Sequence, residues 1–71
     1  MMPDHKIVIS VYYKDPNYDS RAVVCKDIIE GGLFIEYVNK TGDVIRTEPC
    51  PSMSIDQVES KAEDWALEPV I

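Results

Sequence analysis

Four carboxylates near the carboxyl end of the chain are the residues whose type and spacing could do most chemistry. Asp56, Glu59, Glu63 and Asp64 all fall within residues 54–67. Side chains three and four positions apart share one side of a helix, so three of the four would form an acidic stripe. Carboxylates arranged in this way can act as phosphate surrogates and meet a basic protein surface. We therefore name these four as candidate partner-binding residues.

A solvated outer face is the simpler interpretation of the same carboxylates, because surface helices are usually charged on the side away from the core. Asp56 and Glu59 lie in a first turn, where the helix dipole favours negative charge. Glu63 and Asp64 lie beyond that turn, and Glu59 and Glu63 repel each other as an i,i+4 pair. The sequence leaves both interpretations open.

Two tyrosines are further candidates for a contact surface, because tyrosine combines apolar area with a polar tip. Tyr12 alternates with Tyr13 along a predicted strand, and Tyr18 lies in the polar turn that follows it. We expect Tyr13 and Tyr37 to be ordinary sheet residues. Tyr12, on the opposite strand face, and Tyr18, at a loop tip, are the predicted partner-binding tyrosines.

The loop that begins at Asp15 resembles the start of a calcium-binding EF-hand loop, with Asn17 and Asp19 at alternate positions. The match ends there, because Ser20 replaces the glycine at position six and Lys26 replaces the glutamate at position twelve. Predicted strands also flank the loop where an EF-hand has helices. We therefore predict a turn and no metal site.

The remaining reactive side chains form no catalytic set. His5 is the one histidine and has only an aspartate beside it, whereas a general base needs a positioned partner and a pocket. Cys25 lies in an apolar run, and Cys50 lies between two prolines. A disulfide between them depends on whether the fold brings them together. We expect no enzyme activity and no cofactor.

Composition limits the partners of the chain. Its 71 residues hold 13 acids and 7 bases, a net charge of −6, and residues 36–71 hold eight of the acids. This charge disfavours direct binding to nucleic acid or to an anionic membrane and favours a partner protein with a basic surface. No apolar run approaches the roughly 18 residues of a membrane span, and residues 1–6 do not resemble a signal peptide. We expect a cytoplasmic chain.

A carboxyl-terminal amphipathic helix must carry the acidic residues. Ser54 and Gln57 form a capping box, and an apolar face repeats with helical period, in which we expect Trp65 to be buried. The predicted helix spans residues 55–67 and ends before Pro69.

The rest of the chain predicts a sheet. Alternating and β-branched segments predict strands at about 6–14, 21–29, 33–38 and 43–48, joined by polar or glycine-containing turns. Short connections favour antiparallel neighbours. We therefore expect one α+β domain over residues 1–71, with a small antiparallel meander of three or four strands and the helix packed on one face; a sheet curled towards a small barrel is the open alternative.

Two functions compete. The first is a small acidic regulator or inhibitor, in the extreme a nucleic-acid mimic that occupies a basic nucleic-acid-binding surface. A tiny acidic chain without a catalytic set is similar in composition to small phage-encoded inhibitors and nucleic-acid mimics. The second is a structural or adaptor subunit that docks through its sheet face or an edge strand, where charge serves solubility. A homodimer is compatible with both.

Overall fold

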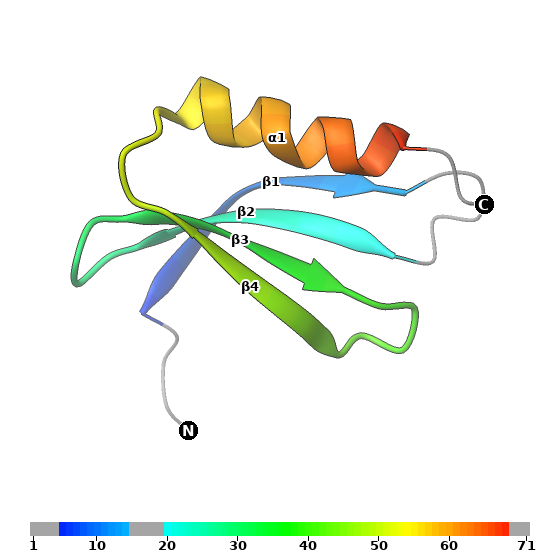
Figure 1. Cartoon of the computed structure of the whole chain (residues 1–71). Helices are drawn as coiled ribbons and strands as arrows, with labels where there is room; N and C mark the ends of the chain where they lie inside the picture. Colours follow the sequence, from blue (N-terminus) through cyan, green and yellow to red (C-terminus); the bar gives the residue numbers. More distant parts are fainter. Residues whose placement is uncertain (1–4, 15–19, 69–71) are drawn as a thin grey trace.

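The structure, a computed structural model, describes residues 5–14 and 20–68 as one helix on a four-stranded sheet. Its elements are β1 (Lys6–Tyr13), β2 (Arg21–Asp27), β3 (Leu33–Val38), β4 (Val44–Cys50) and α1 (Ile55–Leu67). The strands pair antiparallel in the order β1-β2-β3-β4, and α1 lies along one face (Figure 1). The predicted α+β meander is confirmed. The sheet does not close into a barrel, because β1 and β4 are its two edges.

The turn between β2 and β3 is held by Asp27, where the strand ends two residues earlier than predicted. The carboxylate of Asp27 accepts hydrogen bonds from the backbone N–H groups of Ile29, at 2.8 Å, and Glu30, at 3.0 Å. These bonds, that from Glu30 first, lower the pKa of the Asp27 carboxyl. Gly31 has φ +83°, a conformation that L side chains rarely adopt. The side chain of Asp27 therefore stops the strand.

The turn between β3 and β4 is likewise held by side-chain hydrogen bonds to the backbone and by a glycine with positive φ. Oδ1 of Asn39 accepts hydrogen bonds from the backbone N–H groups of Thr41, at 3.1 Å, and Asp43, at 3.0 Å. Gly42 has φ +91°. This asparagine-centred turn is the hairpin loop that the sequence predicts.

Strand β4 continues to Cys50, beyond the predicted end at residue 48. Pro49 lies opposite Phe34, and Cys50 lies opposite Leu33 in β3. The expectation that Pro49 breaks the sheet is wrong. Proline lacks a backbone donor, but an edge strand such as β4 can accommodate it.

Both ends of α1 are capped, one locally and one from a distance. Oγ of Ser54 accepts a hydrogen bond from the backbone N–H of Gln57, whose side chain accepts one from the N–H of Ser54. The last turn of α1 contains no basic residue. Instead, Nζ of Lys14, which follows β1, donates to the carbonyl oxygens of Trp65, at 2.6 Å, and Glu68, at 3.3 Å. A cation beside these carbonyls complements the helix dipole.

The core lies between α1 and the face of the sheet that α1 covers. Its buried members are Ala22, Val24, Ile35, Tyr37, Cys50, Val58 and Ala62. Trp65 is only partly buried, at the rim of this cluster, so the expectation of a buried tryptophan is only partly correct. Its ring packs edge-on against Tyr37, with 5.1 Å between ring centroids. The small side chains of Ala62 and Ala66 bring the helix close to the sheet and leave the tryptophan at its edge.

A β-bulge in β1 changes which side chains face α1. The pairing with β2 shifts between Val8 and Ser10, so that Ile9 is an extra residue. Ile9 and Tyr12 pack against the α1-side core, while Val11 and Val23 pair on the other face. The predicted alternation through β1 is therefore wrong beyond the bulge, because one inserted residue reverses the faces of those that follow.

Candidate functional site

The four predicted acidic residues divide between the two sides of α1. Glu59 is half-buried towards β1, where its carboxylate accepts a hydrogen bond of 2.9 Å from the hydroxyl of Ser10. Glu63, one turn further on, is exposed on the same side, as is Asp56. Asp64 lines a groove on the opposite side, beside β4. The structure therefore brings Asp56, Glu59 and Glu63 together and separates Asp64 from them.

The single base of α1, Lys61, is drawn to the β4 side by Glu48. Its Nζ lies 2.5 Å from one carboxylate oxygen of Glu48, whose other oxygen accepts a 2.9 Å hydrogen bond from the hydroxyl of Tyr37. The hydrogen bond from Lys61, and then that from Tyr37, lower the pKa of the Glu48 carboxyl. The same hydrogen bond raises the pKa of the Lys61 ammonium. Lys61 therefore does not neutralise the exposed carboxylates on the outside of the helix.

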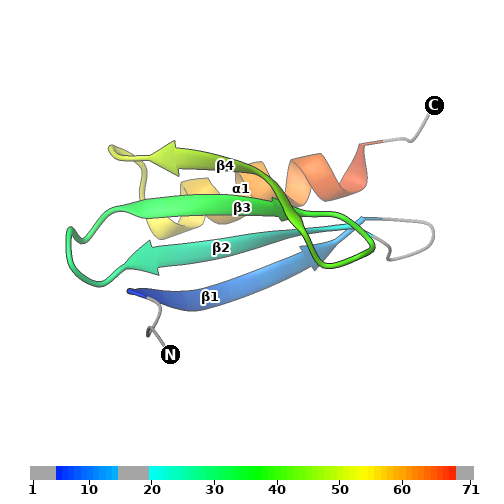
Figure 2. The same cartoon turned by 90° about the horizontal axis from the view of Figure 1, so that it is seen from below.

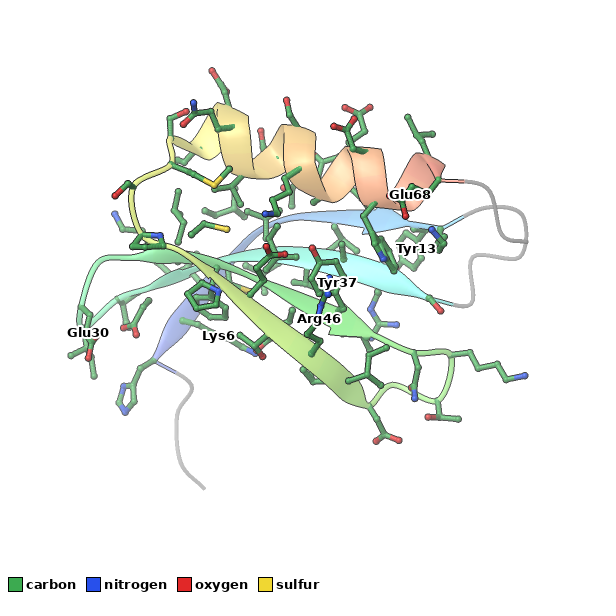
Figure 3. The ribbon with its side chains drawn as sticks, in the orientation of Figure 1. Lys6, Tyr13, Glu30, Tyr37, Arg46 and Glu68 are labelled. Carbon is green, nitrogen blue, oxygen red and sulfur yellow. The ribbon has the colours of Figure 1, made fainter. Side chains whose placement is uncertain are left out.

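A groove of about 470 Å³ lies between α1 and β4. It is lined by Tyr37, Arg46, Glu48, Lys61, Asp64, Trp65 and Glu68. Figure 3 shows Tyr37 and Arg46 side by side below the carboxyl-terminal half of α1, and the Arg46 guanidinium lies 4.3 Å from the centre of the tyrosine ring. Nζ of Lys14 lies 4.5 Å from the centre of the Trp65 ring. These side chains interact with one another, which makes the groove a structural contact between helix and sheet.

Tyr37 is a buried residue of the sheet, but the faces of Tyr12 and Tyr13 are the reverse of those expected. Tyr12 faces α1 and is partly buried against the core, whereas Tyr13 is 51% exposed. Because neighbouring side chains of a strand point to opposite faces, Tyr13 lies on the side away from α1. Tyr18 lies outside the described residues, as do Asp15, Asn17 and Asp19 of the calcium-like loop.

The face of the sheet that α1 does not cover carries apolar residues that sequence reasoning did not assign to a contact surface. Figure 2 views the sheet from this side, with the helix behind it. We call it the open face, and its apolar residues are Val8, Val11, Tyr13, Val23, Cys25, Phe34, Val38 and Val44. Val23, Cys25 and Val38 are buried among their neighbours, and Phe34 packs against them. Val8, Val11 and Val44 around them are 38–53% exposed.

The sequences of the central strands contain the signal that could have revealed this face. In β2, every residue from Ala22 to Cys25 is apolar, and in β3 Phe34 and Val38 add apolar groups on the side opposite Ile35. Strands covered on one face alternate between apolar and polar residues, whereas continuous apolar strands are typical of sheets covered on both faces. The sequence of β2 is therefore that of a strand buried on two sides in a molecule with one helix.

The two cysteines lie on opposite faces of the sheet and are both free. Cys25 belongs to the open face, and Cys50 belongs to the α1-side core. The sheet between them prevents a disulfide within the chain. Burial raises the pKa of the Cys25 thiol to about 11 and raises that of Cys50 as well. At neutral pH both thiols are therefore protonated and poor nucleophiles.

The structure offers few ligands for an ion. His5 is exposed at the start of β1. Among residues 5–14 and 20–68, no three His, Cys, Asp or Glu side chains gather closely enough to hold a metal. Within the same part of the chain, no helix is both long enough and apolar enough to cross a membrane.

Comparisons with known proteins add no relative: no protein-family model, no curated protein and no solved structure matches this chain. Function must therefore be argued from the surfaces described above.

Proposed function

We propose that this protein is a small, non-enzymatic protein-binding subunit, a structural or adaptor component that docks through the open face of its sheet. One observation carries the proposal: the central strands place apolar residues on both faces of the sheet, but α1 covers only one of those faces. Covering Val8, Val11 and Val44 would remove further apolar surface from water, at about 25 cal/mol for each Å² buried. Exposed apolar residues gathered on one face in this way are typical of an interaction site.

The charged groove beside β4 supports a non-catalytic role. Glu48 is held by Lys61 and Tyr37, and Arg46 lies on the ring of Tyr37. A general acid or base must be free to exchange a proton with a substrate. Lys61 and Glu48 instead join α1 to the sheet, and Arg46 and Tyr37 contact each other between β4 and β3.

Affinity capture with matched variants tests this proposal. We would immobilise the wild type, Val11→Glu and Leu67→Glu, and compare the proteins that each retains from a lysate of the organism that encodes it. Both substitutions place a carboxylate on an exposed apolar site, 38% exposed for Val11 and 65% for Leu67, but only Val11 lies on the open face. We expect Val11→Glu to lose the specific partner and Leu67→Glu to keep it. Equal retention by all three proteins would refute docking through the open face.

An acidic regulator that occupies a basic, nucleic-acid-binding surface is the second candidate. It is favoured by the pairing of Lys61 with Glu48 on the β4 side, because Asp56 and Glu63 then remain exposed on the other side of α1 with no base of the helix beside them. Such binding would weaken steeply as salt rises, because it depends on exposed charges.

Charge reversal distinguishes this candidate from apolar docking. Asp56→Lys with Glu63→Lys reverses two exposed carboxylates and spares Glu59, which holds Ser10. An acidic regulator would lose its partner in this double variant, and the wild type would displace that partner from nucleic acid at low salt. A partner retained by the double variant at all salt concentrations would exclude this mechanism.

A further inference from the structure

We propose that the polypeptide that covers the open face is a second copy of this chain, so that two sheets pack face to face with their α1 helices outside. This inference rests on the proposed function, because it names the occupant of the same face. It is carried by three features of that face: its charge, its area and its position relative to the acidic helix.

The open face differs from the rest of the molecule in charge. The chain carries a net charge of −6, and the helix contributes Asp56, Glu59, Glu63 and Asp64 against one lysine. Side chains of one strand alternate, so Lys6, Arg21, Asp27 and Glu36 belong to the open face with Val8, Val23 and Phe34. Two positive and two negative charges on the strands leave this face without net charge. It therefore does not repel its own copy, and it offers no excess charge to a basic or an acidic partner.

One ion pair makes the open face self-complementary. Nζ of Lys6 lies 2.8 Å from the carboxylate of Glu36, between β1 and β3, and the two side chains remain 28% and 16% exposed. In a two-fold dimer each residue of one copy meets the symmetry-related surface of the other. A lysine and a glutamate on the same patch can then pair between copies as well as within each copy, whereas an unrelated partner would have to supply matching charges.

The area of the open face is that expected for the interface of a weak dimer. The seven residues of β2, at about 3.3 Å each, and four strands, about 4.8 Å apart, give a plan area of roughly 440 Å². Protruding side chains raise the accessible area above this value. Stable interfaces bury about 800 Å² per partner, and weak ones fall below about 600 Å². We therefore expect a weak, reversible dimer that dissociates in the micromolar range.

The position of α1 on the opposite face of the sheet reduces the electrostatic repulsion between two associating copies. Because α1 covers the opposite face, stacking the two open faces places the acidic helices on the two outer surfaces (Figure 1). Two packed sheets are about 10 Å apart, and each copy adds its own layer of helix beyond its sheet. The two acidic surfaces are thus farther apart than the Debye length of about 8 Å at physiological salt. The dimer would present both helices to other partners.

The test is the molecular mass in solution as a function of concentration. Sedimentation equilibrium from about 1 to about 300 µM brackets the expected affinity. We expect the wild-type mass to rise from the monomer value of 8.1 kDa towards twice that value. Val11→Glu should raise the dissociation constant more than tenfold, because it buries an unpaired carboxylate in the interface. Leu67→Glu should leave it unchanged.

Val8→Lys is a second open-face variant and should behave like Val11→Glu, in case one substitution impairs folding. Circular dichroism must show native spectra for every variant that is interpreted. A wild type that remains at 8.1 kDa throughout would overturn the proposed dimer while leaving docking of a different partner to the capture experiment. A dimer that survives both open-face substitutions, or that Leu67→Glu also dissociates, would place the contact elsewhere and would equally overturn it.

Discussion

Trp65 contributes to three separate contacts although it is not a fully buried residue. Its ring packs on Tyr37 at 5.1 Å, Nζ of Lys14 lies 4.5 Å above it, and its carbonyl oxygen accepts a hydrogen bond from the same lysine. Aromatic pairs and cation–π contacts each contribute about 0.5–1.5 kcal/mol beyond the area that they bury. The residue therefore joins α1 to two strands from the rim of the core.

We predict that Trp65→Ala lowers the free energy of unfolding by about 2–3 kcal/mol, below the 3–5 kcal/mol of a fully buried aromatic side chain. Part of the ring already contacts water, so less apolar area is lost. Trp65→Phe should cost less, because it keeps a ring against Tyr37. Urea unfolding followed by far-ultraviolet circular dichroism measures both. An unchanged midpoint for Trp65→Ala would mean that the helix docks without this contact.

Cys25 should be unreactive in the folded chain. With its pKa raised from 9.0 to about 11, it holds about 100-fold less thiolate at pH 8 than an ordinary cysteine, and its side chain is buried. We predict slow alkylation by iodoacetamide in a Cys50→Ala background and rapid alkylation in urea. Burial of the neutral thiol stabilises the fold fully below pH 9.0, and this contribution is lost as the pH rises towards 11. Native labelling as fast as that of the unfolded chain would contradict the burial of Cys25.

The carboxyl-terminal end of α1 depends on a residue that lies far away in the sequence. The helix supplies its own capping box at Ser54, but its last turn holds no base, and Lys14 from the β1 side performs that role. The two ends therefore differ in kind: the first turn is capped within the helix, whereas the last turn needs the sheet. Secondary and tertiary structure should form together at that end.

We predict that Lys14→Met lowers the free energy of unfolding by about 0.5–1.5 kcal/mol, the range of a helix-terminal cation together with a cation–π contact. Lys40→Met is the matched control, because Lys40 is exposed in the β3–β4 turn. Hydrogen exchange should show faster exchange of the last-turn amides of α1 in Lys14→Met only. Equal effects of the two substitutions would mean that Lys14 acts only through its positive charge, as any surface lysine does, and not through its contacts with the end of α1.

The fold as a whole is a two-layer arrangement whose second sheet face is open. One helix covers β1, β2 and β3, and within residues 5–14 and 20–68 no second helix or strand lies over the other face. At this size a single core supplies only about 3–5 kcal/mol. A partner that covers the open face would therefore contribute substantially to the free energy of unfolding of the bound protein.

Thermal stability should accordingly depend on protein concentration. If the folded chain dimerises, mass action raises the thermal midpoint as concentration rises, because the unfolded chain does not associate. We predict a rise of several degrees between about 5 and about 300 µM for the wild type. Val11→Glu should show a midpoint independent of concentration, and Leu67→Glu should behave like the wild type. Scanning calorimetry at matched concentrations measures the shift, and a concentration-independent wild type would count against self-association.

Local chemistry was enough to predict the elements of this protein. The Ser54–Gln57 capping box, the turn asparagine Asn39 and the glycines of positive φ act within a few residues of themselves. The order of strands and helix therefore followed from the sequence, with errors only where a side chain such as Asp27 ended a strand or an edge position allowed Pro49 to extend one.

Tertiary structure decided which residues meet. The bulge at Ile9 turned Tyr12 towards the core, and the sheet separated Cys25 from Cys50. The pairing of Lys61 with Glu48, and the exposure of Val11 on the face away from α1, also depend on where distant segments pack. Side chains of a strand point to alternate faces, so one inserted residue moves every later side chain to the other face of the sheet while the strand itself is unchanged. A contact with a residue far away in the sequence likewise cannot be recognised from the neighbouring residues. The sequence by itself thus determined the elements and their order, and only packing determined the surfaces.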